Sequence, residues 1–102
     1  MNQRRLECFL AVVDELHFGR AARRMGMTQP SLSAQIRALE EEMGVVLLER
    51  SSRRVEVTQA GRALADGARS VLVEMDRVFA TTRDVAAGRT GRLTIGSVGA
   101  GF

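Results

Sequence analysis

The chain has 102 residues, about the length of one small domain, and its 45% hydrophobic content is enough for a compact core. It carries 15 basic and 12 acidic residues, for a formal net charge of +3, and every basic residue is Arg. Arginine favours bidentate contacts with phosphate and guanine, so the composition allows a nucleic-acid partner without requiring one. Because the chain has four Phe but neither Trp nor Tyr, stacking of single-stranded bases is disfavoured.

The expected cellular setting follows from one cysteine and from the first residues. Cys8 stands alone, which excludes a disulfide within the chain, and its apolar neighbours Leu6 and Phe9 favour a small buried side chain over a redox centre. Polar residues and not an apolar signal segment begin the chain, and no stretch is apolar enough to span a membrane. We therefore expect a cytoplasmic protein that makes no membrane contact.

Three short helices are predicted in the first half of the chain. They cover about 4–16, 18–25 and 29–43. The first helix supplies the wall on which the other two pack, and its apolar stripe consists of Leu6, Phe9, Leu10, Val13 and Leu16. Together the three helices predict one small core.

The corner between the second and third helices is marked by its residue types. Gly26 stands where the second helix ends, since glycine accepts the left-handed conformation of a C-terminal cap. Thr28 offers a hydroxyl to cap the next helix, and Pro30 suits its first turn. This layout is typical of a helix-turn-helix, which favours DNA as the partner.

The third helix has two distinct faces. At about 100° per residue, its inward stripe consists of Leu32, Ile36, Leu39 and Met43. The outward face is small and polar near its start, and comprises Pro30, Ala34, Arg37 and Glu41, flanked by Ser31, Ser33 and Ala38. Small side chains let a helix approach base edges, where Ser, Gln and Arg form hydrogen bonds. The alternative is an ordinary amphipathic helix with a solvated polar face.

A β-hairpin is predicted next, because two short β-rich runs flank a polar turn. The runs cover 45–50 and 55–57. Arginines and short serines cluster at the turn, namely Arg50, Arg53, Arg54, Ser51 and Ser52. A hairpin after a recognition helix can act as a wing that contacts the DNA backbone or the minor groove, which attracts arginine. The alternative is a solvated surface turn.

A single long helix is predicted from about Thr58, its cap, to Ala87. Its apolar positions recur at spacings of three and four, at Leu64, Ala68, Val71, Leu72, Met75, Val78, Phe79 and Val85. Such a helix is about 45 Å long, more than a three-helix core can cover. We expect a second copy of the same helix to cover the stripe, although Gly61 and Gly67 each cost about 1 kcal/mol relative to alanine. The alternative is packing against another domain of the same chain.

The last residues predict the start of another domain. Residues 88–92 break the helix, and 93–96 predict a strand. The glycines at and beyond this strand do not follow the order of a dinucleotide-binding G-x-G-x-x-G motif. We therefore expect the 102 residues to be the front end of a longer protein.

These features together are similar to one known family. The most specific runs are Ala21–Ala22, Thr28–Ser33 with Gln35–Ile36 and Leu39–Glu40, and Gly44–Arg50 with Thr58, Ala60 and Gly61. From Leu6 to about Phe102 the chain resembles the N-terminal DNA-binding region of a LysR-type transcriptional regulator. The resemblance implies a mainly α fold in three parts: a winged helix-turn-helix (three helices plus a β-hairpin wing) in 1–58, a dimerising linker helix in 59–88, and the hinge and first strand of an effector-binding domain in 89–102.

The same resemblance implies which residues contact DNA. The start of the third helix enters the major groove, and the wing residue Arg53 corresponds to the family's minor-groove residue. Position 34 is often basic in the family but is Ala34 here, so we expect a weaker contact there, compensated in part by Arg37. The predicted DNA-binding residues are Thr28, Gln29, Pro30, Ser31, Ser33, Ala34, Arg37, Arg50, Ser52, Arg53 and Arg54. The predicted dimerisation residues are Leu64, Ala68, Val71, Leu72, Met75, Val78 and Phe79.

The expected partners are double-stranded DNA with an inverted repeat and a second copy of the chain, and, for the full-length protein, a tetramer and RNA polymerase. No cofactor is expected in these residues, and a small-molecule effector would bind the missing C-terminal domain. We expect no enzyme, since His17 is the single histidine and neither a metal-ligand cluster nor a nucleophile with a base is found. Two alternatives stay open: the DNA-binding module of an enzyme such as a recombinase, and an assembly element whose head does not bind DNA.

Overall fold

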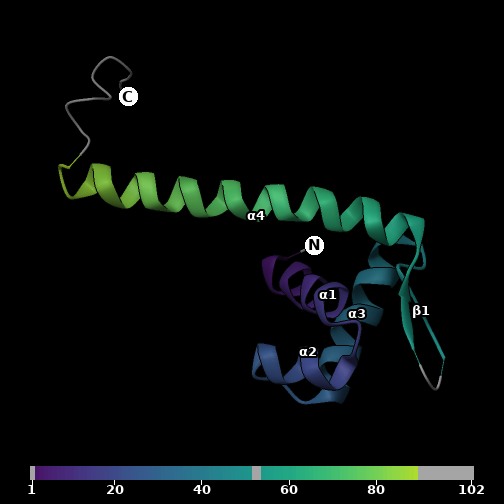
Figure 1. Cartoon of the computed structure of the whole chain (residues 1–102). Helices are drawn as coiled ribbons and strands as arrows, with labels where there is room; N and C mark the ends of the chain where they lie inside the picture. The colour runs from purple at the N-terminus through teal and green to yellow at the C-terminus, as the bar shows by residue number, and fades with distance from the viewer. Residues whose placement is uncertain (1, 52–53, 90–102) are drawn as a thin grey trace. The chain divides into compact units, whose positions relative to one another are not determined.

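The computed structural model describes residues 2–51 and 54–89. Its elements are α1 (Gln3–Glu15), α2 (Phe18–Met25), α3 (Gln29–Met43), β1 (Leu48–Arg50), β2 (Val55–Val57) and α4 (Gln59–Ala86) (Figure 1). The chain divides into two compact units, Met1–Arg69 and Ser70–Phe102. The first unit holds the three short helices, the hairpin and the first turns of α4, so the predicted mainly α architecture with one hairpin is confirmed.

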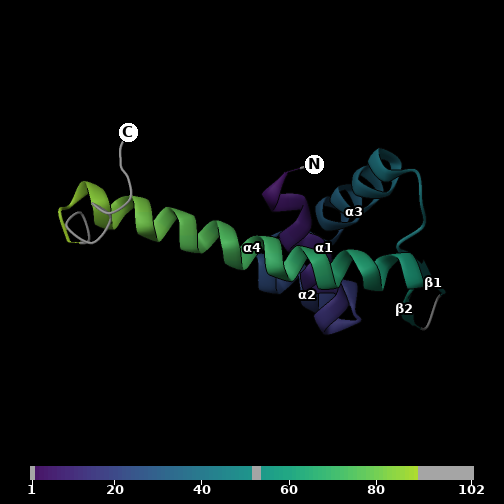
Figure 2. The same ribbon diagram turned by 90° about the horizontal axis from the view of Figure 1, so that it is seen from above.

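The three N-terminal helices form one apolar core. Phe9 of α1 is fully buried, as are Leu32, Ile36 and Leu39 of α3. Leu47, which precedes β1, is also fully buried and extends this core toward the hairpin. Figure 2 shows the same helices and the hairpin from a second direction. One face of α3 therefore packs in the core, and its other face is exposed to solvent.

The ends of these helices lie where the capping residues predict. α2 is followed by Gly26 (φ 66°) and α3 by Gly44 (φ 72°), both in the left-handed conformation that glycine adopts without strain. Thr28 caps the start of α3. Asn2, which the sequence reasoning overlooked, caps α1 by accepting the N–H of Arg5 at 2.8 Å. The predicted bounds of α2 and α3 are therefore confirmed.

Two residues predicted on inward stripes are exposed instead. Leu16 is the C-cap of α1 in a left-handed conformation (φ 50°) and is 50% exposed, and Met43 in the last turn of α3 is 40% exposed. Both predictions were wrong because these residues stand at helix ends, where periodicity does not tell how far the neighbouring helices extend. Cys8 is fully buried, as expected, and this burial raises the pKa of its thiol.

The hairpin consists of two short antiparallel strands. Leu48 pairs with Val57, and Arg50 pairs with Val55. The tip of the turn, residues 52–53, lies outside the described residues. The predicted second strand is confirmed, whereas the first strand is shorter than predicted.

The early part of the predicted first strand is a connection and not a strand. Val45 and Val46 lie before β1 and are 41% and 58% exposed. The carboxylate of Glu40 accepts the backbone N–H groups of Leu47 and Leu48, at 2.8 and 3.2 Å, so the end of α3 determines where the strand can begin. Periodicity and capping did not predict this role of Glu40. The one indication in the sequence was that Glu40 directly follows Leu39 of the inward stripe, so its carboxylate lies beside the core.

The junction of the hairpin and α4 depends on a close approach. The hydroxyl of Thr58 lies 2.8 Å from the carbonyl oxygen of Val46 and accepts the N–H of Gly61 at 3.0 Å. A Cβ at Gly61 would lie 2.3 Å from the carbonyl oxygen of Leu47. The close contact outweighs the helix-propensity cost of Gly61, because only a residue without a side chain lets α4 approach Leu47 this closely.

α4 continues as a single helix to Ala86, one residue short of the predicted end. Gly88 follows in a left-handed conformation (φ 81°). The predicted strand at 93–96, like all residues after Arg89, lies outside the described residues. Among the helices that the structure describes, none is both long enough and apolar enough to cross a membrane.

Candidate nucleic-acid interface

The start of α3 is built by two hydroxyl side chains. The Thr28 hydroxyl accepts the backbone N–H of Ser31 at 3.2 Å and donates to the Ser31 hydroxyl at 2.9 Å. Both side chains were predicted to contact DNA, and both are exposed. Their hydroxyls are occupied with each other, which orients the turn and the first residues of α3.

The outward face of α3 gathers four of the predicted residues around one shallow hollow. Gln29, Pro30, Ser33 and Arg37 line it, and Ala34 is exposed on the same helix. Within residues 2–51 and 54–89, the side chains of Gln29 and Arg37 contact no hydrogen-bonding or ionic partner in the protein. A row of polar groups without protein partners, held by a buried opposite face, can present donors and acceptors to a ligand.

A second hollow lies between α3, the start of α2 and the hairpin, and we refer to it as the wing cleft. Its lining residues are Leu16, His17, Phe18, Gly19, Gln29, Ser33, Arg50, Ser51, Arg54 and Val55. Gln29 and Ser33 line both hollows. The wing cleft thus joins the predicted recognition helix to the predicted wing, and it contains the segment 16–19, which sequence reasoning did not include in the site.

The described arginines of the hairpin have protein partners. The Arg50 guanidinium carbon lies 4.5 Å from the centre of the Phe18 ring, a cation–π contact that ties β1 to the start of α2. Arg54 forms a long ion pair of 3.7 Å with Glu56. Both members of that pair are well exposed, so it holds the side chain only weakly. Ser52 and Arg53 lie outside the described residues, and their roles stay predictions.

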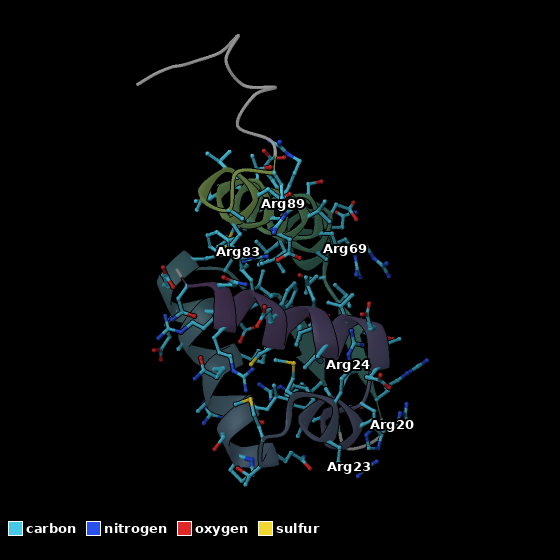
Figure 3. The ribbon with its side chains drawn as sticks, turned by 90° about the vertical axis from the view of Figure 1, so that its left-hand side faces the viewer. Arg20, Arg23, Arg24, Arg69, Arg83 and Arg89 are labelled. Carbon is cyan, nitrogen blue, oxygen red and sulfur yellow. The ribbon has the colours of Figure 1, made fainter. Side chains whose placement is uncertain are left out.

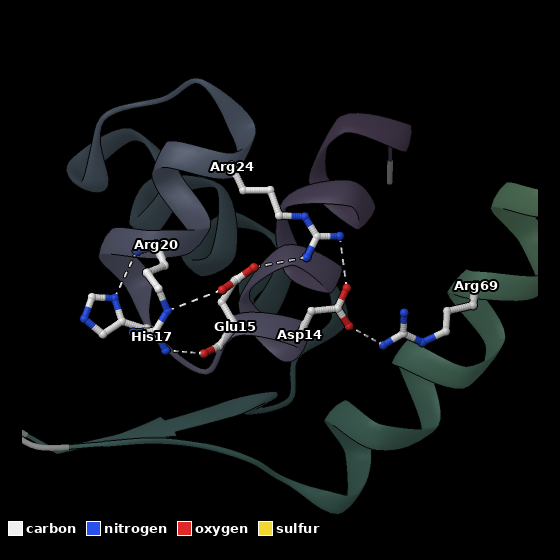
Figure 4. Close-up of polar contacts among 6 residues, drawn as sticks. All are labelled: Asp14, Glu15, His17, Arg20, Arg24 and Arg69. Atoms are coloured by element: carbon white, nitrogen blue, oxygen red, sulfur yellow. Dashed lines mark hydrogen bonds and ion pairs between the residues drawn. The ribbon is translucent and has the colours of Figure 1, made fainter.

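Ion pairs join α1 to α2 and to the first turns of α4. Arg24 contacts Asp14 at 3.0 Å and Glu15 at 3.5 Å, and Arg20 contacts Glu15 at 3.3 Å (Figure 4). Arg69 of α4 contacts Asp14 at 2.8 Å from the other side. Figure 3 labels these arginines on their helices. The hydrogen bond from Arg69, followed by that from Arg24, holds the pKa of Asp14 below its usual value despite partial burial.

The residues predicted for dimerisation fall into two groups. Ala68 is 3% exposed within the single chain, in the first unit, and Leu64 is half-buried there. In the second unit Val71, Val78 and Phe79 are 45% to 50% exposed, while Leu72 and Met75 are half-buried. Only the second group leaves large apolar surfaces open, and Val85 at 43% exposure continues it.

The described part of the chain offers no candidate metal site. Among residues 2–51 and 54–89, no three His, Cys, Asp or Glu side chains are grouped so that they could hold a metal ion. The polar groups that gather instead are the amide, hydroxyl and guanidinium groups of the two hollows.

Three packed helices, a short corner before the third helix and a hairpin after it define the class of winged helix-turn-helix domains. Residues 3–62 match the family model described as bacterial regulatory helix-turn-helix protein, lysR family. The chain therefore belongs to this family.

Curated relatives support the same assignment. The chain is 48% identical over 99 residues to the HTH-type transcriptional regulator AlsR of Bacillus subtilis, covering 97% of this chain and 33% of the relative. It is 55% identical over 75 residues to the DNA-binding transcriptional dual regulator OxyR of Escherichia coli, covering 74% and 25%. The chain thus spans about a third of the length of several curated regulators that it matches.

Solved structures confirm the fold. The BenM DNA-binding domain in complex with catB site 1 DNA superposes with a TM-score of 0.81 at 42% identity, covering 84% of this chain and 96% of that chain. The CbnR DNA-binding domain in complex with DNA gives 0.82 at 41% identity, covering 84% and 99%. The predicted winged helix-turn-helix with a long following helix is therefore confirmed.

Proposed function

We propose that this chain is the DNA-reading part of a transcription regulator, with α3 in the major groove. The observation that carries the proposal is the division of α3 into two faces. Leu32, Ile36 and Leu39 are fully buried, whereas Gln29 and Arg37 are exposed without a protein partner in the described part of the chain. Membership of the lysR family and the DNA complexes of the BenM and CbnR domains support the same partner.

The proposed readout divides the interface by role. Gln29 and Ser33 contact base edges, because their short or planar polar groups start α3 and border both hollows. Arg37, farther along the helix, contacts the backbone, as does Ser52 at the tip of the wing, while Arg53 contacts the minor groove. Since Ala34 offers no charge, Arg37 is the described basic group of this face.

The chain acts as a homodimer in this proposal. The exposed apolar residues of α4 in the second unit, Val71, Val78, Phe79 and Val85, form the surface that a second copy of the helix covers. Two copies place two recognition helices on an inverted repeat, with the spacing determined by the dimer. Both halves of the operator are then needed for full affinity.

The wider role is also a proposal. As a cytoplasmic regulator without catalytic activity, the full-length protein would bind a small-molecule effector in its C-terminal part. It would assemble from dimers to a tetramer and contact RNA polymerase.

The test is binding to three duplexes at two salt concentrations: a random sequence, one selected half-site, and the selected site as an inverted repeat. We expect salt-dependent binding to all three and the highest affinity for the inverted repeat. Equal affinity for the half-site and the repeat, or a monomer on DNA by light scattering, would contradict the dimer. Absence of salt-dependent binding would favour an assembly element over a DNA reader.

A further inference from the structure

The imidazole of His17 has a defined hydrogen-bonding state. His17 is the N-cap of α2, and its Nδ1 accepts the backbone N–H of Arg20 at 2.9 Å (Figure 4). A ring nitrogen that accepts a hydrogen bond carries no proton, so the neutral ring carries its proton on Nε2. In the described part of the chain no group accepts from Nε2. The ring therefore has one donor left for a ligand.

The ring lies at the recognition helix. A Cβ on Gly19 would be 2.9 Å from the His17 ring and 3.8 Å from the side-chain oxygen of Gln29, so both side chains border the bare Cα of Gly19. His17, Gly19 and Gln29 also line the wing cleft together. A ligand that reaches Gln29 from this cleft meets the imidazole.

The charged side chains that line the wing cleft indicate which kind of ligand it would bind. Arg50 and Arg54 line it, and its described lining residues include no Asp or Glu, although Glu56 forms a long, exposed ion pair with Arg54. Two guanidinium groups and a neutral N–H donor favour an anion whose oxygens accept hydrogen bonds. On double-stranded DNA that anion is a backbone phosphate.

We propose that the Nε2–H of His17 donates a hydrogen bond to a backbone phosphate of the DNA whose bases face Gln29, and that Gly19 leaves the space that this contact needs. The inference rests on the proposed function, because it assigns a further contact of the same DNA. It gives His17 two roles at once: Nδ1 caps α2, and Nε2 binds the phosphate.

The test separates the two roles with variants that keep the cap. Serine and aspartate are good N-caps, so His17→Ser and His17→Asp should preserve the thermal unfolding midpoint. Neither offers the Nε2 donor. On a random-sequence duplex we expect His17→Ser to bind about threefold to tenfold more weakly.

Two further readouts distinguish a phosphate contact from a structural effect. Because a neutral donor releases no counterion, His17→Ser should keep the salt slope of the wild-type chain. His17→Asp should lose more affinity than His17→Ser, since its charge repels phosphate. Asn2→Ser is the matched control, as it replaces the cap of α1 and should leave DNA affinity unchanged.

Nitrogen NMR of the imidazole adds a direct observation. We expect the proton on Nε2 in the free chain and a shift of that N–H signal on DNA binding. Wild-type affinity in His17→Ser, or an Nε2 signal unchanged by DNA, would overturn the inference while leaving the proposed function intact. Failure of the wild-type chain itself to bind the duplex would instead overturn the proposed function.

Discussion

The arginines of α2 and α3 carry the same charge but differ in what they contact. Arg20 and Arg24 of α2 are held by the carboxylates of α1, whereas Arg37 of α3, like Arg23 of α2, has no partner in the described part of the chain. A paired arginine positions a helix, and an unpaired one adds to the field that attracts phosphate. For Arg20, Arg24 and Arg37, the partner of each side chain therefore predicts which substitution changes stability and which changes DNA binding.

The largest effect on recognition should come from Gln29→Ala. Removing the amide should cost about 1–3 kcal/mol of discrimination at one base position. Stability should not change, because this side chain has no protein partner in the described residues. Competition between the selected site and its single-base variants measures the effect.

Gln59→Ala is the control for this variant, since it removes an exposed glutamine at the start of α4 and should leave discrimination intact. An equal loss of affinity by Gln29→Ala on every sequence would show a backbone contact and would remove its assigned role.

Removal of a carboxylate that pairs with arginines should lower stability instead. Asp14→Asn removes the charge that Arg24 and Arg69 share. These pairs are partly exposed, so solvent screening limits the expected loss in the free energy of unfolding to about 1 kcal/mol. Denaturant unfolding measures it, and base preference should stay that of the wild-type chain. A change in base preference without a change in stability would place Asp14 in the reading surface.

A smaller effect should appear in the pH dependence of stability. The pKa of Asp14 is lowered in the folded chain, so its contribution is present above the unfolded-state value of about 4 and is lost as the pH falls through the folded value. The difference in unfolding free energy between the wild-type chain and Asp14→Asn should therefore shrink below about pH 4. If this difference in unfolding free energy stays constant down to about pH 2, the packing of the Asp14 side chain and not its charge is responsible for it.

The helix bounds were predictable because local chemistry determines them. Gly26, Thr28 and Gly44 act within one turn of their own position, and the structure places the ends of α2 and α3 at these residues. The buried stripe of α3 followed from periodicity for the same reason. Only its last member, Met43, was wrong, because its burial depends on where other helices end.

The features that the sequence did not predict depend on contacts between distant segments. Glu40 determines the start of β1 across the connection after α3, and Gly61 is required by the carbonyl of Leu47. The wing cleft forms only when the hairpin meets the start of α2, so periodicity could not include His17 in the site. The outward face of α3 was predicted, whereas its neighbour across the cleft was not.

The most direct test of the account compares the salt dependence of DNA binding for Arg37→Gln and Arg24→Gln. Arg37→Gln should weaken binding on all sequences and reduce the salt slope by about one unit at unchanged stability. Arg24→Gln should lower stability and keep the slope, since its charge is already paired with Asp14 and Glu15. A reduced slope in Arg24→Gln together with a wild-type slope in Arg37→Gln would contradict the assignment of α3 as the helix that faces DNA.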